Sequence, residues 1–452
     1  MEQRKYGLIT AITVIAGSVI GSGIFFKSYT VLSVTGGSVI QGVIAFCAAA
    51  IGIIFGGLAV GQLALRTDRP GGVINYSETF FGKKMACVYG WFHLIAYYPA
   101  FTCVIAWIGG VYLCMLFGWE GTLENQCLVA AVLITVLYAL NMYNAKWGGR
   151  VQDVSVMIKL IPLLMFAVVG LLFGDPEIGI NYHAEGVETS GTWLKAVPAV
   201  LFSFDGWILA TTICHEIRDS KRNLPLALAI TPLIILICYV AYFVGMSNYM
   251  GVENILALGS DHLQAAAEKL LHSSFGVKLI LTFVVISVTG TVNGLALTAS
   301  RMAYSLSIRK MFPCADKFTY VDPKHGVNRN SSLLAWALTL VLLVIHYITQ
   351  KTGVMGAGDV SEISVIANSG FVIVLYVAVI RLARKGEITS IFNGYVVPIL
   401  AIIGSLVCVY AGFTNPMFPW YLLGCAIVIL IAWRYACSHP EIEDVVLGDN
   451  EG

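Results

Sequence analysis

The stretch GSVIGSGIFF, residues 17–26, interrupts a long apolar segment near the start of the chain. It places glycine and serine where a helix in a bilayer favours leucine. Glycine lowers helix stability, and serine competes for backbone hydrogen bonds. Because lipid offers no hydrogen-bond partners, irregular backbone at this depth is tolerated only where it lines a cavity. The stretch therefore predicts a broken membrane helix beside a binding site.

The composition around this stretch is that of an all-α membrane protein. The chain has 452 residues, of which 58% are hydrophobic and 12% are charged, against about 25% charged residues in soluble domains. The net charge of +1 gives no reason to expect a nucleic-acid partner. The scattered cysteines and histidines have no metal-ligand spacing, and HExxH is absent. No metal, cofactor or catalytic residue is therefore expected, and we do not expect the chain to be an enzyme.

Twelve apolar segments are long enough to be transmembrane helices, given that a span needs about 20 residues. They run near 8–31, 38–64, 86–117, 127–144, 152–173, 194–214, 225–248, 277–303, 332–349, 361–382, 395–413 and 418–436.

The basic residues orient these spans. With both termini in the cytoplasm, 21 of the 27 Lys and Arg residues fall on the cytoplasmic side, and Lys159 falls inside a span. The five on the outer side are Lys27, Lys195, Lys269, Lys278 and Lys351. The outer segment 249–276 has helical apolar spacing and is expected to lie on the membrane surface.

A second break, FSFDGW at residues 202–207, lies in the sixth predicted span, five spans after the first. The same broken helix in two halves of opposite orientation predicts an inverted repeat. One transporter domain, 1–436, then contains repeat one at 8–173 and repeat two at 194–382. Extra helices at 395–436 and a cytoplasmic tail at 437–452 follow. The acidic stretch EIEDVVLGDNEG of the tail, residues 441–452, is expected to be disordered.

The two breaks predict a site for an α-amino acid. A broken helix offers free N–H groups at one half-helix start and free C=O groups at the other half-helix end. We expect Gly21, Ser22 and Gly23 to donate to a carboxylate. The carbonyls of Ile20, Phe202 and Ser203 would accept from the ammonium group.

Glycine pairs spaced as GxxxG have a simpler explanation, because they also let two helices approach closely. Such pairs are Gly17/Gly21, Gly52/Gly56 and Gly57/Gly61. We interpret the pairs of the second span as packing. Residues 21–23 are interpreted as the site, since packing leaves the matching break unexplained.

Charged and polar residues inside spans give further candidates. Lys159 could reach the surface, supply a fixed charge in place of sodium, or carry a proton. Asp205 could bind the ammonium group, pair with a cation or cap the second half-helix. Thr291 and Asn293 in the eighth span could face the cavity or bond to other helices. An aromatic residue of FSFDGW could act as a gate or simply pack.

The chain resembles the amino acid–polyamine–organocation superfamily, in particular its L-type amino acid transporter branch and the bacterial serine/threonine exchangers. The resemblance covers about residues 7–436. It is carried by GSVIGSGIF (17–25), RTDRPGGVINY (66–76), KLIP (159–162), FSFDGW, CHEIRDSKRNLPLAL (214–228) and the VNG…SR pattern of span eight.

This resemblance implies a five-plus-five inverted repeat with helices 1 and 6 broken, alternating access, and sodium-independent exchange of neutral amino acids. It places Phe202 at the outer gate and matches Lys159 to the family's lysine in span five. The residues that it implies for the substrate site are Ile20, Ser22 and Gly23, facing Phe202, Ser203 and Asp205.

Two departures refine the expectation. Asp205 stands where animal relatives carry a smaller residue, which favours the small substrates serine, threonine, alanine, glycine or cysteine. The loop 118–126 lacks the cysteine that joins animal relatives to a glycoprotein heavy subunit. We therefore expect a bacterial inner-membrane protein without that partner, of open oligomeric state.

Other transporter classes remain as alternatives. A proton-coupled symporter using Lys159 is the main one. A channel would need a selectivity filter or charge rings, and neither is evident. A polyamine carrier would need several buried acids, whereas Asp205 is the only acidic residue deep in a predicted span.

Overall fold

The computed structural model describes residues 7–21, 23–67, 72–143, 158–184, 186–207, 219–322, 327–356 and 358–444. Across these ranges nine helical segments are long and apolar enough to cross a membrane. They are α3 (Val39–Ala64), α5–η1–α6 (Lys83–Phe117), α7 (Leu123–Tyr143), α11 (Ser220–Met250), α14 (Ser274–Ser307), α15 (Arg329–Thr352), α16 (Val360–Arg384), η5–α17 (Phe392–Gly412) and α18 (Phe418–Ser438).

The remaining predicted spans contain shorter helices. These are α1 (Leu8–Val19), α2 (Gly23–Val34), α9 (Leu160–Phe173) and α10 (Trp193–Phe204). Each of the twelve predicted segments therefore contains a described helix, and the all-helical class is confirmed. How many of these segments cross a bilayer stays a prediction.

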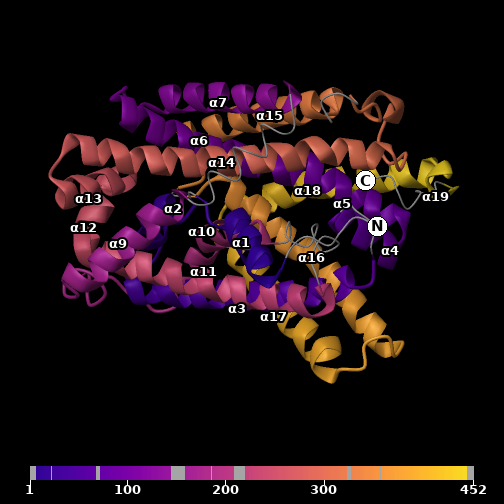
Figure 1. Cartoon of the computed structure of the whole chain (residues 1–452), viewed down its shortest axis with the longest axis horizontal. Coiled ribbons are helices and arrows are strands. Elements are labelled where there is room, and N and C mark those ends of the chain that lie inside the picture. The colour runs from indigo at the N-terminus through magenta and orange to yellow at the C-terminus, as the bar shows by residue number, and fades with distance from the viewer. Residues whose placement is uncertain are drawn as a thin grey trace.

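The short helices α1, α2 and α10 lie between two layers of longer helices (Figure 1). One layer is formed by α6, α7, α14 and α15, which all pack against one another. The other contains α3, which packs against α11 and α17. This arrangement surrounds both helix breaks with protein, which is the condition for irregular backbone at membrane depth.

The third predicted span contains a π-helical turn, η1 (His93–Tyr97), between α5 (Lys83–Phe92) and α6 (Tyr98–Phe117). Pro99 lies two residues after its end, in the first turn of α6. Proline has no N–H and its ring crowds the preceding turn, so a helix must widen or kink there. The wider turn keeps the span continuous and redirects its side chains.

The glycine pairs of the second span are packing contacts, as expected. A Cβ at Gly52 would lie 3.4 Å from the Cα of Gly404 in α17. Cβ atoms at Gly57 and Gly61 would lie 3.3 and 3.1 Å from Leu228 of α11. Glycines of α3 thus permit the close approach of α17 at Gly52 and of α11 at Gly57 and Gly61.

Gly170 of α9 and Gly245 of α11 form a closer helix contact, because a Cβ at Gly170 would lie 2.0 Å from the carbonyl oxygen of Gly245. We expect Gly170→Ala to destabilise the protein by about 1–3 kcal/mol, the usual cost of overpacking. The melting temperature of the purified protein in detergent would fall. Gly424→Ala in α18 is the matched control, since a Cβ there meets nothing within 4 Å. An unchanged melting temperature in Gly170→Ala would contradict this contact.

The ends of the molecule differ in part from the expectation. The outer segment forms α12 (Val252–Leu258) and α13 (His262–Leu271), at the opposite end from α4 (Val73–Phe81) and α19 (Glu441–Asp444) (Figure 1). The expected disorder of the tail is wrong for residues 441–444, because they form α19. Buried Ile442 anchors it, and the Lys83 ammonium donates to the Glu443 carbonyl over 2.7 Å.

Candidate functional site

The first predicted break is present. Helix α1 ends at Val19, and Ile20 adopts an extended conformation with φ −67° and ψ 110°. Its N–H still bonds to the Ala16 carbonyl over 2.8 Å. Helix α2 begins at Gly23, so Ile20 and Gly21 lie outside both helices, and Ser22 lies outside the described residues. Ile20, Gly21 and Gly23 are buried.

The second predicted break is also present. Helix α10 ends at Phe204, and Asp205 is extended with ψ 157°. Gly206 follows with φ +101°, a conformation that residues with a side chain rarely adopt. The glycine of the DGW sequence thus turns the chain sharply. The segment after Trp207, residues 208–218, lies outside the described ranges.

The two breaks lie against each other. A Cβ at Gly23 would be 3.0 Å from the Cα of Ser203 and 3.1 Å from the Phe202 ring. A Cβ at Gly21 would be 3.0 Å from the Thr291 hydroxyl of α14. The structure thus brings these five predicted residues together, and the two glycines permit the approach.

Tyr239 of α11 links the breaks and was not found by sequence reasoning. Its hydroxyl donates to the Ser203 carbonyl over 3.0 Å and lies 3.5 Å from the Val19 carbonyl. A tyrosine in the middle of an apolar span is the signal that could have found it, because a buried hydroxyl usually has a partner. Of the three predicted ammonium acceptors, the Ser203 carbonyl is already bound, and that of Phe202 accepts from the Asp205 N–H over 3.4 Å.

Two hydrogen bonds hold the Asp205 carboxylate in place. It is 6% exposed. One carboxylate oxygen accepts from the Gly206 N–H over 2.9 Å, and the other accepts a short hydrogen bond from the Tyr97 hydroxyl. No basic side chain of the described residues pairs with it. Tyr97 comes from the π-helical turn η1, which explains how the third span reaches the second break.

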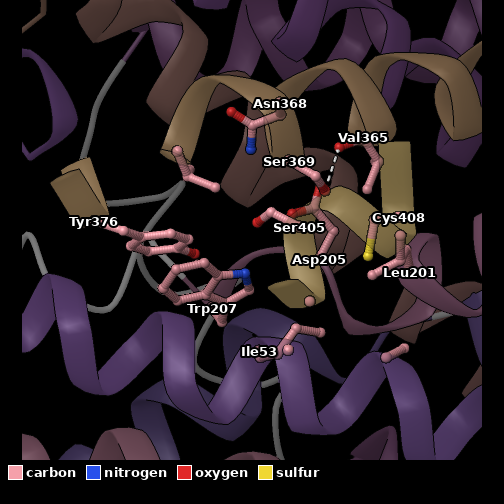
Figure 2. A pocket seen from close by; sticks show the side chains of 14 residues that line it. Ile53, Leu201, Asp205, Trp207, Val365, Asn368, Ser369, Tyr376, Ser405 and Cys408 are labelled. Carbon is pink, nitrogen blue, oxygen red and sulfur yellow. Dashed lines mark hydrogen bonds between the residues drawn. The ribbon is translucent and has the colours of Figure 1, made fainter. Parts of the chain in front are cut away.

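Asp205 also lines a small pocket between α3, α10, α16 and α17 (Figure 2). Asp205, Ser369 and Ser405 gather on one side of it, and Trp207 lies beside Tyr376. Its volume is about 40 Å³, which suffices for a few waters at roughly 10–15 Å³ each. Ligand pockets are typically several times larger. The pocket beside Asp205 is therefore too small for an amino acid.

Two other predicted residues have different surroundings. The amide oxygen of Asn293 accepts from Asn141 of α7 over 3.1 Å, so the structure pairs it with α7. Lys159 is 1% exposed at the start of α9, so its side chain does not reach the surface. Whether either takes part in binding or coupling stays a prediction.

Lys27 and two acids were not among the predicted site residues. Lys27 is 1% exposed, and its ammonium lies 2.5 Å from carboxylate oxygens of both Asp359 and Glu362. The count of basic residues placed Lys27 on the outer side, and the structure shows that it is buried within α2. Its acidic partners were not singled out, because both lie near a span end and are 332 and 335 residues away in the sequence.

Comparisons with known proteins match this chain to amino acid transporters. A model of the amino acid permease family matches residues 6–433. The serine/threonine exchanger SteT of Bacillus subtilis (strain 168) is 30% identical over 409 residues, covering 89% of this chain and 90% of the relative. The b(0,+)-type amino acid transporter 1 of Mus musculus is 29% identical over 307 residues, covering 67% and 62%. The human cystine/glutamate transporter is 28% identical over 311 residues, covering 68% and 61%.

Proposed function

Because the chain belongs to the amino acid permease family, we propose that it exchanges small neutral L-amino acids across a membrane by alternating access, without sodium. The substrates would be serine, threonine, alanine, glycine and cysteine. The meeting of two broken helices, where Gly23 lies against Ser203, carries this proposal. Broken helices in transporters supply backbone groups to the carboxylate and ammonium groups that all these substrates share.

The proposed fold has twelve spans, with a five-plus-five inverted repeat and two additional helices. Equivalent helix contacts in the two halves support the repeat. Helix α1 packs against α11 as α10 packs against α3, and α6 packs against α7 as α14 packs against α15. Likewise, α9 packs against α11 as α16 packs against α3. In each of these three pairs, the second contact is the first one shifted by five spans.

In the proposed binding mode, the N–H groups of residues 21–23 hold the substrate carboxylate. The carbonyl of Ile20 and the second lone pairs of the Phe202 and Ser203 carbonyls take the ammonium group. Thr291, beside Gly21, would contribute a hydroxyl, and Asn293 would stabilise α14 through Asn141. The small pocket at Asp205 leaves little room for a long side chain.

The role of Lys159 distinguishes the exchanger from the alternative proposal, a proton-coupled symporter. Its burial supports a role inside the protein, either as a fixed charge beside the first break or as a proton carrier. We favour the fixed charge, because an ammonium group near an open helix C-terminus stabilises free carbonyls.

The proposed location is the inner membrane of a bacterium, with both termini in the cytoplasm and the α12–α13 end outside. The distribution of Lys and Arg supports this orientation. The absence of a cysteine in loop 118–126 supports function without a glycoprotein heavy subunit.

Transport into liposomes tests the function. The purified protein is reconstituted, and uptake of radiolabelled L-serine is measured with and without internal unlabelled serine, at symmetric pH and without sodium. Uptake confined to preloaded vesicles supports exchange. Uptake into empty vesicles that rises with an inward proton gradient supports the symporter instead. If neither vesicle type takes up any neutral amino acid, the proposed function is wrong.

Asp205 tests the preference for small substrates. We expect Asp205→Gly to raise exchange of leucine relative to serine by about tenfold, because one methylene of space in an apolar pocket changes discrimination by 10–200-fold at about 1–3 kcal/mol. Competition of labelled serine uptake by leucine measures this ratio. Asp205→Asn keeps the bulk and removes the charge, so it shows which of the two excludes leucine. An unchanged ratio in both variants would contradict the role of Asp205.

A further inference from the structure

A buried ion cluster lies one helical turn beyond the first break. Lys27 follows Gly23 by four residues in α2, so the two residues lie on the same face of that helix. Its partners, Asp359 and Glu362, lie at the start of α16. All three side chains are nearly inaccessible, with relative exposures of 1%, 2% and 5%. We refer to these residues as the Lys27 cluster.

The cluster joins α2 firmly to the beginning of α16. One oxygen of Asp359 caps α16 by accepting from the N–H groups of Ser361 and Glu362 over 2.9 and 3.3 Å. Its other oxygen accepts from the Lys27 ammonium over 2.5 Å. The Glu362 carboxylate accepts from the same ammonium over 2.5 Å. Lys27 is thus the cation shared by two buried carboxylates.

The same ammonium also contacts the second break. It lies 4.9 Å from the centre of the Phe202 ring, within the range of a cation–π interaction. Phe202 in turn packs edge-to-face on Phe101 of α6, with ring centres 5.1 Å apart. Beside them, Phe26 packs on Trp107, also of α6, at 5.2 Å. Charged and aromatic side chains from α2, α6, α10 and α16 therefore cover the breaks on the α12–α13 side.

We propose that the Lys27 cluster holds the site closed on the α12–α13 side, and that its ion pairs must separate whenever the site opens to that side. Removing one partner of a buried ion pair leaves an uncompensated charge, which is more stable when it is hydrated. Loss of Lys27 would leave two adjacent carboxylates in the interior, which repel each other. Both the repulsion and the gain from hydration would favour the state in which the site is open on the α12–α13 side. The role in an exchange cycle rests on the proposed function, whereas closure of this side does not.

Chemical labelling tests the closure without requiring transport. Ser203, which is 2% exposed at the junction of the breaks, is changed to cysteine. Its reaction with a membrane-impermeant maleimide is measured in intact cells and in inverted vesicles. Labelling of native cysteines is subtracted with the same proteins carrying Ser203. Using both membrane preparations keeps the result independent of the predicted orientation.

We expect Lys27→Met to raise the labelling rate of the cysteine at least fivefold from the α12–α13 side. Lys27→Arg preserves the charge and should stay within about twofold of the parent rate. Lys351→Met is the matched control, because Lys351 forms an exposed ion pair with Glu124 at the same end of the molecule. It should leave the labelling rate unchanged. A folded Lys27→Met protein that labels at the parent rate would overturn the proposal.

A second variant covers the case in which Lys27→Met does not fold. The double change Asp359→Asn and Glu362→Gln leaves a residue that can still cap α16. It leaves the Lys27 ammonium buried without a counter-charge, so we expect at least fivefold faster labelling there too. A folded double variant with the parent rate would also overturn the proposal. Failure of serine exchange in the liposome assay, with labelling as expected, would reject the proposed function and leave the closure intact.

Discussion

Gly23→Ala is expected to reduce serine exchange by about tenfold. The added methyl group would lie 3.0 Å from the Cα of Ser203 and 3.1 Å from the Phe202 ring. The first neighbour is backbone and cannot rotate away, so the two breaks must move apart. Overpacking costs about 1–3 kcal/mol, which is about 5–150-fold in an equilibrium. Initial rates of serine uptake into preloaded liposomes measure the effect.

Gly370→Ala is the control for this variant. Gly370 is also a helical glycine, in α16, but a Cβ there would lie 3.6 Å from its nearest neighbour, at an ordinary contact distance. Exchange by Gly370→Ala should match the parent. Both changes add one methyl group, but only the one at Gly23 would meet the backbone of the other break, so a difference between the variants reports the position beside the breaks. Equal exchange by the two variants would show that close approach of the breaks is not needed.

Tyr239→Phe is expected to reduce exchange by about 5–150-fold, because leaving a buried hydrogen-bonding group unsatisfied costs about 1–3 kcal/mol. The lost hydroxyl donates to the Ser203 carbonyl over 3.0 Å and lies 3.5 Å from the Val19 carbonyl. Without this hydroxyl, the ends of α1 and α10 no longer share a hydrogen-bond donor. Uptake rates and serine affinity of the purified variant measure the loss.

Tyr242→Phe is the matched control, in the same helix and equally buried. The structure gives its hydroxyl no hydrogen-bond partner among the described residues. Its removal should therefore leave exchange near the parent rate. If Tyr242→Phe lowers exchange as much as Tyr239→Phe does, then the effect comes from packing of α11 and not from the carbonyls of the breaks.

Both helix breaks could be predicted because their cause is local. Glycine and serine at residues 17–23, and Asp205 followed by Gly206, weaken a helix whatever surrounds them. The apolar segments also follow from composition alone. Close helix packing at Gly52 was predicted, but its partner Gly404 was not, because GxxxG spacing does not identify the partner helix.

The contacts that complete the site could not be predicted, because they join distant parts of the chain. Tyr97 reaches Asp205 across 108 residues, and Tyr239 reaches Ser203 across 36. The burial of Lys27 was not foreseen, because a count of basic residues records position along the chain and not burial. Its partners were missed for the same reason, since Glu362 lies at the very start of a predicted span.

The π-helical turn at His93–Tyr97 has a consequence for comparisons between members of the family. A π turn absorbs one residue more than an α turn, which advances every later side chain by about 100° around the helix axis. A relative without this turn would be aligned to the present chain only with a one-residue gap inside a membrane segment. Threading this sequence onto such a relative without the gap would rotate Tyr97 off Asp205 and turn the whole of α6 toward the wrong neighbours.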